Sequence, residues 1–221
     1  MPAPPHQSGA LDGESEQLRP LVRNPNFLKF ISARWFNSLA IQLVTVTVGW
    51  QIYEMTSDPL DLGLVGLSQF APIFFLFLAA GVAADRYNRR AIIAGCNLTH
   101  VLVSGFLLLY AHSGSSEPWP IFLVLLLHGC ARAFYHPSLT SVLPNLIPIS
   151  QFPSAIAYAT SAGKLSQLAG PALAGLMIAL IGTWVYLIAL VSFAIAAACA
   201  ALLVSPRRER PKRAVTFTEL V

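Results

Sequence analysis

Long apolar stretches recur along this chain, and short polar segments separate them. Each stretch is close to the length of about 20 residues that a helix needs to cross a lipid bilayer. The first, fourth and fifth stretches contain polar interruptions. The pattern predicts an all-α integral membrane domain over residues 25–204, a bundle of six transmembrane helices near 27–53, 62–84, 91–110, 119–143, 152–181 and 184–204.

Composition supports a lipid environment. Hydrophobic residues make up 55% of the 221 residues and charged residues 11%, whereas a soluble domain carries about 25% charged residues. All three cysteines lie inside apolar stretches. We therefore interpret them as small buried hydrophobic residues rather than as disulfides or metal ligands.

Basic residues predict the orientation in the membrane. They gather before or at the start of the first predicted helix, between the second and third, and after the sixth. The loops on the opposite side of the membrane contain acidic residues and no Lys or Arg. Cytoplasmic loops are enriched in Lys and Arg, so both termini are expected in the cytoplasm. Residues 1–24 are polar and contain no signal-peptide core, so they predict a disordered cytoplasmic tail. Residues 205–221 predict a basic cytoplasmic connector.

The segment 81–90, GVAADRYNRR, places four charges between two apolar stretches. Gly81 would permit close helix approach, and Asp85 is placed to cap a helix N-terminus. Asn88 tolerates the left-handed conformation of a tight turn. Three basic side chains would hold the loop in the cytoplasm and pair with the carboxylate or with lipid phosphate: Arg86, Arg89 and Arg90.

This segment resembles the signature loop of the major facilitator superfamily, which reads Gly, three residues, Asp-Arg, one residue, Gly and two basic residues. Asn88 stands where the second Gly is usual. The resemblance implies that Gly81, Asp85, Arg86 and the residues that follow form a conformational-switch loop. A plain positively charged hairpin on the cytoplasmic side is the alternative.

A second resemblance lies in QLAGPALAGL, residues 167–176. It is similar to the Gly-Pro motif in the fifth span of many exporters of this superfamily, and Gly170, Pro171 and Gly175 carry it. The residues themselves predict a packing stripe, because small residues recur every four positions through Gly170. Pro171 would also free the carbonyl of Gln167 and permit a kink. Generic small-residue packing remains the alternative.

Three charged residues lie inside predicted spans: Arg34, Arg132 and Lys164. Charges at this depth are costly unless they face a cavity or a partner, and no Asp or Glu lies deep in any predicted span. The residues thus indicate a polar cavity for an anionic or polar substrate. Arg34 could instead reach the inner interface, and Arg132 could pin a helix kinked near Pro137. The full set of cavity candidates is Arg34, Asn37, Gln69, His128, Arg132, Lys164 and Gln167.

Histidines offer no metal site. His128, Arg132 and His136 share one helix stripe at a spacing of four, and the cation between the imidazoles opposes a metal ion. His100 and His128 could serve a proton-linked step or make structural hydrogen bonds. No phosphate-binding glycine loop, catalytic triad or carboxylate pair is evident, so we expect no enzyme, no cofactor and no nucleic-acid partner.

The segments FLKFISARWFNSLA and GCARAFYHPSLTSVLPNLIP resemble the branch with enterobactin-type siderophore and drug exporters. Carriers of this superfamily bind substrate between two six-helix halves. The resemblance implies an N-terminal half of a secondary exporter in the bacterial inner membrane, with its first, second, fourth and fifth spans facing the cavity. Its partners would be lipid, a small amphipathic molecule, an optional proton, and the missing half or a second copy. The alternative is a half-sized, self-assembling membrane protein with a structural or regulatory role.

Overall fold

The computed structural model describes residues 21–203. The predicted connector over 205–221 lies outside them, as do residues 1–20 of the predicted tail over 1–24. Residues 21–24 of that tail are structured, because Leu21 is buried in a short 3-10 helix and Asn24 caps the first α-helix. Each predicted span corresponds to one α-helix, and the ends differ by a few residues. Short 3-10 helices accompany them at Leu21–Arg23, Ile149–Gln151 and Gly182–Trp184. The α-helices are α2 (Pro25–Thr56), α3 (Pro59–Arg86), α4 (Arg89–Ala111), α5 (Trp119–Leu146), α6 (Phe152–Ile181) and α7 (Val185–Ala201).

Side-chain caps set the first two helix starts. The Asn24 side chain accepts hydrogen bonds from the backbone N–H groups of Asn26 and Phe27, and Pro25 follows it. A proline suits this position because its missing N–H would have no intrahelical partner. α2 ends where Ser57 adopts a left-handed conformation with φ 53°, and Asp58 then caps α3 through Leu60 N. The chain therefore reverses between α2 and α3 within two polar residues.

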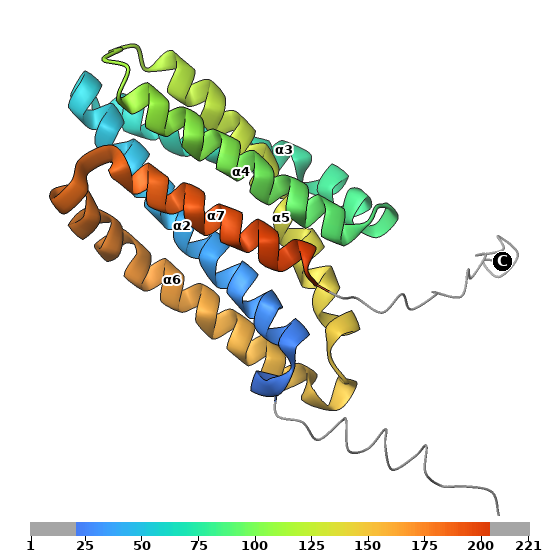
Figure 1. Ribbon diagram of the computed structural model, residues 1–221. Helices are drawn as coiled ribbons and strands as arrows, with labels where there is room; N and C mark the ends of the chain where they lie inside the picture. The colour runs from blue at the N-terminus through green and yellow to red at the C-terminus, as the bar shows by residue number, and fades with distance from the viewer. Residues whose placement is uncertain (1–20, 204–221) are drawn as a thin grey trace, which may run out of the picture.

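The helices pack with α2 near the middle of the bundle. Figure 1 shows α4 and α7 side by side in front, α2 behind α7, and α6 along the opposite edge from α3. α3 packs against α5, α5 packs against α4, and α6 packs against α2. α3 and α6 are the least buried of these helices, and each buries only one narrow stripe. One side of α2 is thus covered by α7, and its other side lies between α6 and α3.

Apolar side chains from several helices form the core. Tyr186 and Phe193 of α7 are fully buried, and so is Leu107 of α4. The Tyr186 hydroxyl donates to Gln51 Oε1 of α2 at 2.7 Å, which satisfies a polar group in an apolar environment. The side of α7 that meets α2 and α4 is therefore a packing surface.

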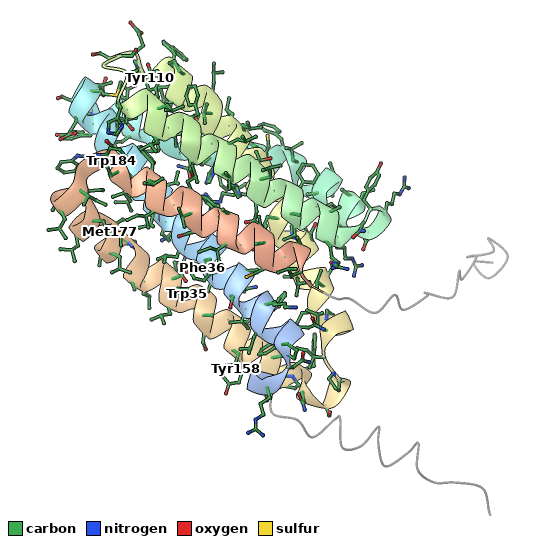
Figure 2. The ribbon with its side chains drawn as sticks, in the orientation of Figure 1. Trp35, Phe36, Tyr110, Tyr158, Met177 and Trp184 are labelled. Carbon is green, nitrogen blue, oxygen red and sulfur yellow. The ribbon has the colours of Figure 1, made fainter. Side chains whose placement is uncertain are left out.

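Charges divide the two ends of the bundle. We call the end with Lys29, Arg86, Arg89 and Arg90 the basic end, and the end with Glu54, Asp58, Asp61 and Glu117 the acidic end. Two of these basic side chains bind the C-terminal end of α7, because Lys29 Nζ and Arg90 Nη2 donate to the carbonyls of Leu202 and Ala201 at 3.2 Å each. Tyr110 and Trp184 lie at the acidic end and Tyr158 lies near the basic end (Figure 2), where aromatic side chains of membrane proteins favour the interfaces.

Length and composition alone make three helical stretches of the described residues apolar enough to cross a membrane. They are Pro59–Arg86, Arg89–Ala111 and Phe152–Ala201, and the last of them contains both α6 and α7. α2 and α5, two of the three helices with polar interruptions, are not among them. The structure therefore agrees with a helical membrane bundle, and the count of six spans stays a prediction.

The first testable prediction concerns orientation. In cells that express a variant without native cysteines, Glu117→Cys is expected to react with a membrane-impermeant maleimide before permeabilisation, because Glu117 lies at the acidic end. Tyr87→Cys at the basic end is the control and should react only after permeabilisation. Labelling of position 117 only in permeabilised cells would reverse the predicted orientation.

Candidate functional site

A polar stripe follows one side of α2. Its members recur at spacings of four, four, three and four residues, so they share one helix face. All of them are partly exposed within the bundle. We call this stripe the polar face of α2, and it consists of Arg34, Ser38, Gln42, Thr45 and Gly49.

Two glycines of α6 fit against this face. A Cβ added at Gly163 would lie 3.4 Å from Arg34 Nη2, and a Cβ added at Gly170 would lie 2.6 Å from Gln42 Cβ. Gln42 Nε2 also donates to the backbone carbonyl of Gln167 at 3.3 Å. Pro171 cannot donate to that carbonyl, because proline has no N–H. The predicted freeing of the Gln167 carbonyl is thus matched by a partner on α2.

The third residue of the Gly-Pro motif has a different environment. A Cβ added at Gly175 would meet no atom within 4 Å, so no close packing in the described residues requires a glycine there. Ser166, Gly170 and Ala174 are buried, as the small-residue stripe predicted.

Gln69 joins three helices beside the polar face. It lies on α3, is 4% exposed, and its Oε1 accepts from Thr45 Oγ1 at 3.2 Å and from Arg132 Nη1 at 3.1 Å. A Cβ added at Gly129 would lie 2.6 Å from the Gln69 carbonyl oxygen and 3.0 Å from Pro72 Cγ. Gly129 therefore lets α5 touch the α3 backbone one turn away from Arg132. Sequence reasoning missed the roles of Thr45 and Gly129.

The remaining cavity candidates do not join this group. Asn37 is buried on α2, and its amide donates to Asn97 Oδ1 of α4 at 2.9 Å. Lys164 is exposed on α6 and donates to Gln167 Oε1 on the same helix at 3.2 Å. The seven candidates therefore occupy several separate places along the bundle.

His128 also lies away from the polar face. Its ring lies 4.4 Å from the ring of His100 and 6.2 Å from that of Phe193, measured between centroids, and both histidines are 0% exposed. The described residues provide no hydrogen-bond partner for any of the four imidazole nitrogens. The structural hydrogen bonds that the sequence suggested for these histidines are thus not found in this part of the chain.

A cavity of about 740 Å³ opens toward the acidic end between α2 and α6. None of the seven candidates lines it, but Thr45 does, and this residue also contacts Gln69. Trp50 and Tyr53 present large exposed aromatic surfaces to it. Sequence reasoning missed both, although Tyr53 follows Gly49 of the polar face by four residues. A mostly apolar cavity with a few polar groups suits a small amphipathic molecule.

The segment 81–90 differs in detail from its prediction. Asp85 lies in the last turn of α3 and does not cap a helix in the described residues, where its side chain pairs with Arg89 at 3.8 Å. Asn88 is the cap of α4 and accepts from Arg90 N at 3.1 Å in an extended conformation with φ −68°, so its predicted left-handed conformation is wrong. A Cβ added at Gly81 would meet no atom of residues 21–203 within 4 Å, so this part of the chain does not make the expected close helix approach.

Arg89 bonds to the backbone of two helices. Its Nε donates to the Ala84 carbonyl of α3 at 3.0 Å, and its Nη1 donates to the Ser141 carbonyl of α5 at 2.6 Å. Carbonyl groups near a helix C-terminus carry partial negative charge, so cationic side chains stabilise them. The basic residues of this segment therefore hold helix ends together, a role that the charge pattern alone did not reveal.

Comparison with known proteins gives the family. The family model described as transmembrane secretion effector matches residues 16–220. Macrolide efflux protein A of Streptococcus pyogenes is 27% identical over 143 residues, which are 62% of this chain and 35% of that protein. The enterobactin exporter EntS of Salmonella choleraesuis is 28% identical over 161 residues, 72% of this chain and 38% of that protein.

A third relative is the staphyloferrin A transporter of Staphylococcus aureus, 22% identical over 151 residues, 68% of this chain and 38% of that protein. The chain thus spans little more than a third of the length of these relatives. Apolar helices with a polar face on α2 define a multi-pass helical membrane protein. The chain belongs to the transmembrane secretion effector family of the major facilitator superfamily, whose members are transporters and not enzymes.

Proposed function

We propose that this chain supplies the N-terminal six-helix half of a secondary active exporter in a bacterial plasma membrane. Its substrates would be small amphipathic molecules of siderophore or drug type, and the second half would come from a continuing chain or from a second copy. The names of its relatives support this substrate range, since they include a macrolide efflux protein and an enterobactin exporter.

The polar face of α2 is the observation that supports the proposal most. It lies between α3 and α6, on the side of α2 that α7 leaves uncovered. At the acidic end it continues into the cavity beside Trp50 and Tyr53. In carriers of this superfamily the substrate binds between two halves near the middle of the membrane. A second half facing the polar face would enclose a path with polar groups along one wall.

Deletion of the gene in its native host tests the proposal. Cells without the gene should accumulate more of some compounds from a panel of labelled siderophores and macrolides, and expression of the gene should restore the lower level. Accumulation that is unchanged for every compound would contradict the proposed export. Purification of a stable self-assembled oligomer in that case would favour the alternative, a half-sized protein without transport activity.

Asp85 gives a second testable prediction. In the functional carrier, Asp85→Asn is expected to reduce export strongly while the thermal midpoint changes little. Its carboxylate is 70% exposed and its pair with Arg89 measures 3.8 Å, and an exposed ion pair contributes at most about 1 kcal/mol. Asp61→Asn at the acidic end is the matched control for export normalised to membrane abundance. Normal export by the Asp85 variant would leave the plain cytoplasmic hairpin as the better interpretation.

A further inference from the structure

We propose that the C-terminal end of α7 carries a site for the headgroup of an anionic phospholipid such as phosphatidylglycerol. Lys29 of α2 and Arg90 of α4 would bind the phosphate, and the exposed side of α7 would lie along the acyl chains. The site is outside the proposed substrate path, because the polar face of α2 lies on the side that α7 leaves uncovered. The inference therefore does not depend on the proposed export.

Two cationic side chains from different helices meet at the end of α7. Lys29 Nζ donates to the carbonyl of Leu202 and Arg90 Nη2 donates to the carbonyl of Ala201, each at 3.2 Å. α7 packs against both α2 and α4 (Figure 1), so each cation approaches the last turn of α7 from a neighbouring helix. Because the two accepting carbonyls belong to consecutive residues, one headgroup could contact both cations.

Each of the two cations keeps donors for a ligand. An ammonium and a guanidinium carry several N–H donors, and α7 accepts from only one donor of each. Lys29 and Arg90 are both partly exposed, so their remaining donors are accessible from outside the bundle. Both groups bind phosphate oxygens, and the planar guanidinium offers paired N–H groups for two of them. The hydrogen bonds to α7 thus hold the cations in place without using all their donors.

The charge around this end of α7 favours an anionic partner. Within residues 21–203 no carboxylate pairs with Lys29 or Arg90, because Asp85 pairs with Arg89 and the other acidic residues lie at the acidic end. The sequence adds positive charge after α7, since residues 207–213 contain five basic residues and one acidic residue. Clusters of basic residues beside a transmembrane helix attract anionic lipid. A phosphate would supply the negative charge that the protein lacks here.

Position along the helices matches a lipid headgroup. Lys29 lies about 6 Å along α2 from its start at Pro25, and Arg90 is the second residue of α4. Both cations are therefore near helix ends, at the level where a bilayer has its phosphates. Long basic side chains close to a helix end reach toward this interface.

An apolar stripe on α7 favours a lipid over a soluble anion. Its members recur at spacings of four, four, three and four residues, so they share one helix face. They are exposed, and the last of them is the residue whose carbonyl accepts from Lys29: Leu187, Val191, Ile195, Ala198 and Leu202. Acyl chains along this stripe would hold the headgroup beside the cations, and a soluble phosphate has no such contact.

Native mass spectrometry of the purified 221-residue chain in detergent tests the site. Phosphatidylglycerol is the probe, and phosphatidylcholine with the same acyl chains is the matched control and should bind more weakly. Lys29→Gln and Arg90→Gln should each weaken phosphatidylglycerol binding about fivefold, the contribution of one basic side chain near anionic lipid. The double variant should bind the two lipids equally. Arg86→Gln removes an exposed charge at the same end and should bind phosphatidylglycerol like the wild type.

Further variants separate lipid binding from folding. Lys29→Arg and Arg90→Lys keep the charge and should retain most of the affinity, and each variant's thermal midpoint without lipid reports whether it folds. A ligand that binds only the folded state raises the thermal midpoint. Phosphatidylglycerol should therefore raise the midpoint of the wild type more than phosphatidylcholine does, and this difference should disappear in the double variant.

Three results would overturn the proposal. Equal binding of the two lipids by the wild type would show that the headgroup charge is not recognised. An equal loss in Arg86→Gln and Arg90→Gln would show that only the overall charge of the basic end matters. Displacement of phosphatidylglycerol by inorganic phosphate would identify a site for a soluble anion instead of a lipid.

Discussion

Gly129→Ala is expected to lower the thermal midpoint of the purified protein. An added Cβ would lie 2.6 Å from the Gln69 carbonyl oxygen and 3.0 Å from Pro72 Cγ. The carbonyl belongs to the backbone of α3, so it cannot rotate away as a flexible side chain would. Overpacking of this kind costs about 1–3 kcal/mol, which exceeds the gain of about 1 kcal/mol that alanine brings in helix propensity. Separation of α3 from α5 should also disturb the Gln69–Arg132 hydrogen bond.

Gly95→Ala provides the matched control for this variant. Gly95 lies inside α4, and a Cβ added there would meet no atom within 4 Å. Helix propensity alone then applies, so Gly95→Ala should keep or raise the thermal midpoint. If differential scanning fluorimetry in one detergent gave both variants the same midpoint, the contact between α3 and α5 at Gly129 would be wrong.

Arg89→Gln is expected to be the most damaging single change in the segment 81–90. The side chain of Arg89 is 17% exposed, and it donates to two backbone carbonyls on α3 and α5. A glutamine amide is shorter and neutral, so it cannot replace both bonds. Hydrogen bonds to charged groups contribute about 1.5–3 kcal/mol each. Loss of both hydrogen bonds of Arg89 should therefore lower the free energy of unfolding by about 3 kcal/mol or more.

Arg86→Gln tests whether charge alone matters at this position. Arg86 is exposed, and the described part of the chain offers it no hydrogen bond. The Arg86→Gln variant removes one positive charge, as Arg89→Gln does, but it removes no hydrogen bond between helices. The thermal midpoint should therefore fall much further in Arg89→Gln. Equal midpoints would mean that these arginines serve only to set the orientation of the loop.

The helices were predictable from the sequence because an apolar run of bilayer length can satisfy its backbone hydrogen bonds in lipid as a helix and in few other structures. Pro171 and Gly170 were also predictable, because a missing N–H and a missing side chain have fixed local consequences. The cap of α4 was not, since Asp85 and Asn88 are both good capping residues. The choice between them depends on where α3 ends, and α3 continues through Arg86.

The candidate site was predictable only in part. Periodicity places Arg34 and Arg132 on a helix face, but it does not reveal which neighbouring helix that face meets. Asn37 therefore lies toward α4 and His128 toward His100, away from the polar face. Gly129 was missed because a glycine carries no chemical signal, and its importance comes from the α3 backbone that lies against it.

The polar face of α2 is central to the proposed function, and cysteine accessibility in the functional carrier tests it most directly. The native cysteines Cys96, Cys130 and Cys199 are first replaced by alanine. Ser38→Cys lies on the polar face, whereas Ala40→Cys lies at a position of α2 that is 0% exposed. A small water-soluble thiol reagent should modify position 38 rapidly, transported substrate should slow that reaction, and position 40 should stay unmodified. If the thiol reagent modified neither position 38 nor position 40, the result would contradict a water-filled path along α2.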